Sequence, residues 1–154
     1  SARDSCDAAE AILRERCTGV TWEITNARLF GALAAVFCGD YNDLRRRMFQ
    51  PLRESKERGD LYAHANYTTA VGYLLAIADG DAELATREVE DAMSQWSQQG
   101  FHVQHFMALL ARVQIQLCTG NAKEAVRLIE SPLGFGRVVG SMGGRAPAMT
   151  ASML

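Results

Sequence analysis

The stretch GDLYAHANYTTAVGYLLAIADGD, residues 59–81, decides the fold of this 154-residue chain. Its apolar residues recur at helical spacing, and a Gly-Asp dipeptide stands at each end. Glycine adopts the left-handed conformation that ends a helix, and the aspartate after it can accept hydrogen bonds from the free amides that begin the next helix. The stretch therefore predicts one helix over about 61–78, with a tight turn on both sides.

The same glycine signal recurs along the chain in two interleaved series. The period within each series is 40 or 41 residues, and the series are offset by about half a period: Gly19, Gly59 and Gly100, and Gly39, Gly80 and Gly120. A fixed period of this length is typical of helical repeats. Because each two-helix hairpin leaves an apolar face uncovered, neighbouring hairpins must stack to bury it.

Apolar residues at steps of three and four between these glycines predict seven helices. They cover about 5–17, 20–38, 41–58, 61–78, 82–98, 101–117 and 122–131. Pro51 lies inside the third helix, which we expect to kink or split there. No segment alternates as a strand does, so we predict an all-α fold: an α-solenoid of stacked antiparallel helical hairpins, similar to tetratricopeptide repeats but with a period of about 40 residues.

The chain is expected to divide into two regions. Residues 1–131 form the helical-repeat domain, with a lone helix at 5–17 and hairpins at about 20–58, 60–98 and 101–131. Residues 132–154 form a glycine-rich tail without periodicity, for which we expect an irregular structure. Since the first helix lacks a hairpin partner and the last is short, we expect a segment of a longer protein.

Composition excludes several classes of function. The formal net charge of −2 gives no general attraction to nucleic acid or acidic lipid, and no stretch has the length of a membrane span. We therefore expect a cytoplasmic protein without nucleic-acid or membrane partners. The cysteines form no Cys-x-x-Cys pair, which favours buried thiols in a reducing compartment over a zinc site; they are Cys6, Cys17, Cys38 and Cys118.

No constellation of catalytic residues emerges from the sequence, and we expect neither a cofactor nor a metal. The glycine-rich run over 134–140 has its third glycine one position late for a nucleotide loop, and both lysines of the chain precede it. His102 and His105 are three residues apart and could begin a metal site, but a third ligand is missing. We expect them to form hydrogen bonds within the turn between hairpins or to pack against the preceding helix. His64 has no neighbour in the sequence that indicates a role.

Two surfaces are candidates for contacts with a partner. The third helix is basic and the fifth acidic, and because they are equivalent members of adjacent hairpins we expect ion pairs between them, with a charged partner surface as the alternative. The other candidate is the concave face, which the first helix of each hairpin lines in stacked arrays. Near the start of these helices lie Trp22, Asn26, Tyr62, Asn66, His102 and His105. Asparagines 40 residues apart could clamp an extended peptide backbone, whereas the aromatic residues could equally belong to the core.

Three motifs resemble one known family: CTGVTWE at 17–23, RGDLYA at 58–63 and WSQQGFHVQH at 96–105. They resemble the C-terminal tetratricopeptide-like helical-repeat region of large bacterial eukaryotic-like serine/threonine protein kinases, in which a kinase domain and an ATPase-like module precede the repeats. The resemblance covers about residues 5–131 and departs after Glu130, where another long amphipathic helix would be expected. It transfers no catalytic residue, because the kinase residues belong to a domain outside this chain.

Three hypotheses on function follow. The first is a non-catalytic protein–protein interaction or regulatory region, whose partner is a protein, a peptide or another domain of the same chain, and whose parent would be a signalling kinase. The second is a small-ligand-sensing module of a bacterial signalling or transcription regulator, with the ligand in the concave groove. The third, a small helical enzyme, would need a buried polar cluster that the sequence does not reveal.

Overall fold

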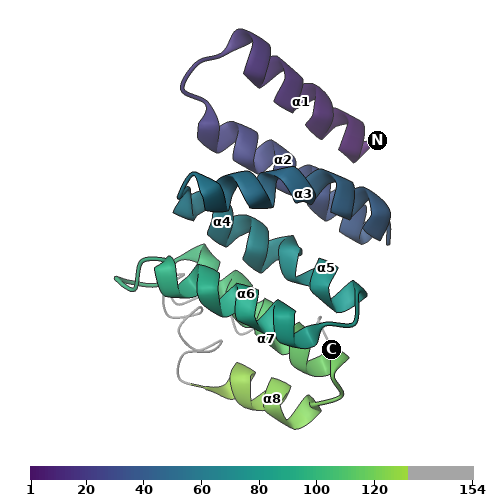
Figure 1. Cartoon of the computed structure of the whole chain (residues 1–154), viewed down its shortest axis with the longest axis vertical. Helices are drawn as coiled ribbons and strands as arrows, with labels where there is room; N and C mark the ends of the chain where they lie inside the picture. The colour runs from purple at the N-terminus through teal and green to yellow at the C-terminus, as the bar shows by residue number, and fades with distance from the viewer. Residues whose placement is uncertain (132–154) are drawn as a thin grey trace, which may run out of the picture.

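The computed structural model describes residues 1–131, and every regular element in that range is a helix (Figure 1). The elements in chain order are α1 (Ala2–Arg16), α2 (Thr21–Phe37), α3 (Tyr41–Glu57), α4 (Leu61–Tyr67), η1 (Thr68–Gly72), α5 (Tyr73–Ala78), α6 (Ala82–Gln95), α7 (Val103–Cys118) and α8 (Ala122–Glu130). The prediction of an all-α fold is confirmed for these residues. The tail predicted over 132–154, with its glycine-rich run, lies outside them.

All six glycines of the two series have the left-handed backbone that the sequence predicted, with φ between 65° and 82°. The glycines at 39, 59, 80 and 120 close short turns in the same way. In each turn the glycine amide donates to the carbonyl three residues back, and the next amide donates to the carbonyl five residues back. This is the Schellman pattern, which satisfies the last carbonyls of the helix and requires positive φ at the glycine.

The residue after each of these glycines was expected to cap the following helix. Three aspartates do so, because each carboxylate accepts from the amide three residues further on: Asp40 from Asp43, Asp60 from Ala63 and Asp81 from Leu84. The expectation is wrong for Asn121, whose side chain makes no capping hydrogen bond. Its side-chain nitrogen Nδ2 donates instead to Gln116 Oε1 at 3.0 Å, so the side chain of Asn121 is oriented toward the end of the preceding helix.

Each helix packs against the next along the chain, and Figure 1 shows them following one another in this order, with α1 at the top and α8 at the bottom. Their buried apolar side chains form two clusters. One lies between α2, α3, α4 and η1, and the other between α5, α6 and α7. Leu74 of α5 contacts both clusters and joins them.

Two local features bear on the predicted helices. Of the two outcomes expected at Pro51, the split does not occur, because α3 continues through that residue. The irregularity lies instead within the helix predicted over 61–78, where η1 takes the wider turn of a π-helix between α4 and α5. A Cβ on Gly72, at the end of this turn, would be 3.3 Å from Leu52 Cδ2 of α3. The turn therefore ends at a residue whose small size lets α3 approach.

The expectation of buried cysteines is wrong. Cys6 is half-buried, and the other three are exposed, all as free thiols: Cys17, Cys38 and Cys118. The exposed three stand at the carboxyl ends of α1, α2 and α7, just before a turn. A helix end next to a turn faces solvent even when the helix centre is packed.

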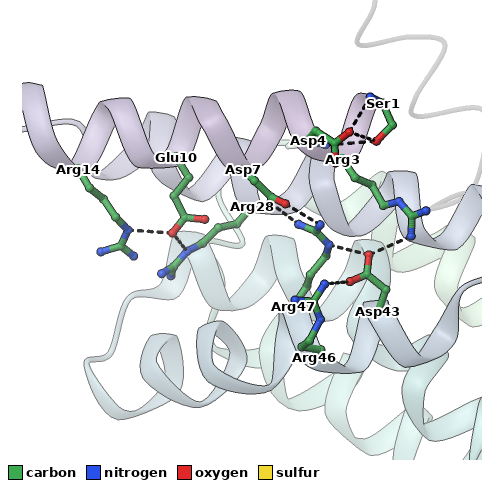
Figure 2. A network of polar contacts seen from close by, with 10 residues as sticks. All are labelled: Ser1, Arg3, Asp4, Asp7, Glu10, Arg14, Arg28, Asp43, Arg46 and Arg47. Carbon is green, nitrogen blue, oxygen red and sulfur yellow. Dashed lines mark hydrogen bonds and ion pairs between the residues drawn. The ribbon is translucent and has the colours of Figure 1, made fainter.

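Ion pairs join α1 to α3 (Figure 2). Arg47 of α3 donates to both carboxylate oxygens of Asp7, at 2.5 and 2.9 Å. The buried Asp43 carboxylate accepts from Arg47 at 2.8 Å, from Arg3 at 3.2 Å and also from Arg46. Burial by itself would raise the pKa of Asp43, but these hydrogen bonds outweigh burial and lower the pKa to about 2. Asp43 thus connects the two helices as a charged group.

The predicted pairing of the basic third helix with the acidic residues of the next hairpin is found at two positions. Lys56 lies 3.6 Å from Asp91 of α6, and Arg45 lies 2.6 Å from Asp79 at the end of α5. The other arginines of α3 pair within their own helix or with α1. Among residues 1–131, Arg47 is thus the basic side chain of α3 that pairs with α1, through Asp7.

Candidate functional site

The six residues predicted to line a binding face fall into two groups. Tyr62, His102 and His105 come together around Trp96, whereas Trp22 and Asn26 lie on α2. Asn66 belongs to neither group. It is buried, and its side chain contacts Gln104 of α7. The predicted face is therefore not one continuous surface.

Trp96 is the centre of an aromatic cluster at the turn between α6 and α7. Its ring centroid lies 6.4 Å from that of Tyr62 and 5.9 Å from that of His102, which meets it edge-on. His102 in turn stacks on His105 at 5.7 Å, and Phe101 lies 5.6 Å from His105. The sequence predicted that the helix runs to about residue 98 and gave Trp96 no place in a binding face. The helix ends at Gln95 instead, so Trp96 opens the turn, where it also packs against the core.

The two histidines form hydrogen bonds within the turn, which confirms one of the two alternatives expected for them. The His102 amide donates to His105 Nδ1 at 3.0 Å, and His102 Nε2 lies 2.9 Å from the Gln99 carbonyl oxygen. In the part of the chain that the structure describes, no group of three or more His, Cys, Asp or Glu side chains is placed to hold a metal ion. Both hydrogen bonds lie at the turn that leads into α7.

The asparagine hypothesis is corrected by the structure. Asn26 and Asn66 do share one geometry, since each donates from its side-chain nitrogen to the carbonyl four residues earlier, at 2.8 Å. Asn66 is buried, however, and its Oδ1 accepts from Gln104 Nε2 at 3.3 Å. Its amide is thus engaged inside the protein and is not free to clamp a peptide.

Three aromatic side chains of α2 are exposed. Trp22 and Phe30 are both 58% exposed, and Phe37 is 86% exposed. We call these three side chains the α2 aromatic stripe. The buried residues of α2 are small by comparison: Thr25, Gly31, Ala32 and Ala35.

The small residues on that buried face explain the exposure. A Cβ on Gly31 would be 3.3 Å from Cys6 Cβ of α1 and 3.1 Å from Arg47 Nη1 of α3. Neighbouring helices therefore come too close on this side for an aromatic ring, and the rings of α2 point away from them. Periodicity identifies such faces but does not say which one is buried.

Within residues 1–131, no helix has the length and apolar character needed to cross a membrane. The chain has no significant match to a protein-family model, to a curated protein or to a solved structure.

Proposed function

We propose that this chain is a non-catalytic protein-interaction or regulatory module, an α-solenoid of tetratricopeptide-like hairpins that binds a protein or peptide on the α2 aromatic stripe. The observation that carries the proposal is the exposure of three aromatic side chains, Trp22, Phe30 and Phe37, on one face of a well-packed helix. Exposed apolar patches of this kind mark interaction sites, and aromatic residues dominate their binding energy.

The stripe has the length of a peptide-binding surface. Trp22 and Phe37 are separated by four turns of helix, or about 22 Å at 1.5 Å per residue. α2 begins the first predicted hairpin, and the first helices of stacked hairpins line the concave side of a solenoid. A partner segment lying along α2 would therefore meet all three rings, whether it comes from another protein or from another domain of the same chain.

The resemblance to the repeat region of bacterial serine/threonine protein kinases supports a parent protein of that class. In such a parent this module would recruit a partner protein or regulate another domain of the same chain. The sequence that precedes Ser1 in the parent tests this part of the proposal. A kinase catalytic loop upstream would support it, and an unrelated upstream domain would refute it without affecting the stripe.

Peptide-display selection on the chain, followed by affinity measurements, tests the binding face. Phe30→Asp should weaken the selected peptides by about tenfold or more, because it places a charge in the middle of the stripe. Phe49→Asp is the matched control, since Phe49 is also exposed but lies on α3. Peptides that bind both variants as they bind the unmodified chain would refute the proposal.

A further inference from the structure

A groove of about 630 Å³ lies between the end of α6, the start of α7 and the end of α8. We call it the α6–α8 groove. Its apolar lining consists of Met93, Phe101, Leu109 and Leu128. Protein pockets that hold a ligand have volumes of about 300–1,000 Å³, so this groove is large enough to take several side chains of an occupant.

A difference in helix length accounts for the groove. α8 has 9 residues and α7 has 16, so α8 is about 10 Å shorter at 1.5 Å per residue. In the first predicted hairpin, by contrast, α2 and α3 both have 17 residues. The start of α7 supplies His105 and Leu109 to the groove, whereas Leu128 and Ser131 come from the end of α8. The groove therefore lies where α8 stops short of covering α7.

The charged groups that line the groove within residues 1–131 already have partners. Arg112 donates from Nε to Glu90 Oε1 at 2.7 Å and from Nη2 to Glu90 Oε2 at 3.0 Å. His105 Nδ1 accepts from the His102 amide at 3.0 Å. A charged occupant would lose its hydration without gaining an ion pair from this lining. The groove therefore favours an uncharged, apolar segment.

The chain leaves α8 beside this groove. Ser131, the residue that follows α8, lines the groove and has an extended backbone with φ −63° and ψ 152°. Pro132 comes next, and a residue before proline favours this conformation over a helical one. The following residues, PLGFG at 132–136, carry no charge and include Leu133 and Phe135. At about 3.3 Å per residue, Phe135 can reach any point within about 13 Å of Ser131.

We propose that the α6–α8 groove binds residues 132–136 of the same chain, with Phe135 as the apolar anchor against Met93 and Leu128. The segment has the neutral, apolar character that the lining favours. Because it is attached at Ser131, its effective concentration at the groove is of the order of millimolar, which a separate peptide must exceed to displace it. The segment thereby takes the place of the helical turns that α8 lacks.

Two other occupants fit the same lining, the equivalent segment of a second copy and an apolar peptide from another protein, and the test below separates them from the proposal. The proposal does not rest on peptide binding at the α2 aromatic stripe, because no residue of the stripe lines the groove. Either site can therefore fail its test without affecting the other.

NMR of the intact chain with ¹³C-labelled methionine methyl groups tests the proposal. Met93 reports on the groove, and Met48, which is fully buried in the other apolar cluster, is the internal reference. In the unmodified chain we expect NOEs between the ring protons of Phe135 and the Met93 methyl group. Phe135→Ser should shift the Met93 signal, because an aromatic ring displaces the resonance of a methyl group beside it, and should leave Met48 nearly unchanged.

Met149→Ser is the matched control, since it removes another apolar side chain beyond Ser131 but lies outside residues 132–136. It should leave the Met93 signal in place, and thermal melts verify that both variants fold. A Met93 shift that is the same at all protein concentrations supports docking within one chain. A shift that grows with concentration would assign the groove to a second copy and overturn the proposal. An unchanged Met93 signal in Phe135→Ser, or equal shifts at Met93 and Met48, would overturn it as well and leave the groove to a separate peptide.

Discussion

Replacing Asp43 by asparagine tests whether the ion pairs between α1 and α3 stabilise the fold. The substitution keeps the shape of the side chain but removes the charge that Arg3, Arg46 and Arg47 contact. The structure lowers the pKa of Asp43 from its ordinary 3.8 to about 2, and such a difference corresponds to about 2 kcal/mol of stability at neutral pH. Because Arg46 is largely exposed, salt screens part of this, and we expect a loss of about 1–2 kcal/mol.

The dependence on pH distinguishes this mechanism from a general loss of packing. A carboxylate with a lowered pKa in the folded state contributes fully above its unfolded pKa of 3.8, and the contribution is lost as the pH falls through about 2. The unmodified chain and Asp43→Asn should therefore differ at neutral pH and converge as the pH falls from about 4 to about 2.

Urea unfolding of both proteins at several pH values measures this difference directly. Glu83→Gln serves as the control, because its exposed carboxylate should contribute little at any pH. Hydrogen exchange in α1 gives a second readout, since a weakened contact between Arg3 of α1 and Asp43 should increase opening of that helix first. A difference in unfolding free energy that stays constant with pH would refute the reasoning.

Two further predictions use contrasts within the chain. Asp60→Ala should lower the unfolding free energy by about 1 kcal/mol because it removes a capping hydrogen bond, whereas Asn121→Ala should cost much less because Asn121 caps no helix; thermal or urea melts of the pair check this, and equal losses would contradict it. Trp22→Phe should leave the less accessible tryptophan, Trp96, so the remaining fluorescence should shift to shorter wavelength and resist acrylamide quenching; a red-shifted, strongly quenched signal would show that Trp96 does not pack against Tyr62 and His102.

The sequence by itself determined the helices and the turns between them. All six predicted glycines have positive φ, and three of the four predicted caps are present. These features could be predicted because they depend on residues within five positions of each other: a glycine without a Cβ, and an aspartate in reach of the next amides. The exception, Asn121, shows the limit of such rules, since its short polar side chain found a partner in the preceding helix instead.

Only the tertiary structure decided which helix faces became surface and which residues met. The rotation of α2 about its axis exposes Trp22, Phe30 and Phe37, and it follows from the close approach of α1 and α3 on the side of Gly31. The same applies to a cavity lined by His64 of α4 and by Glu88 and Asp91 of α6. Periodicity gives the spacing of residues on one helix, but the angle between helices is set by long-range packing that no local pattern contains.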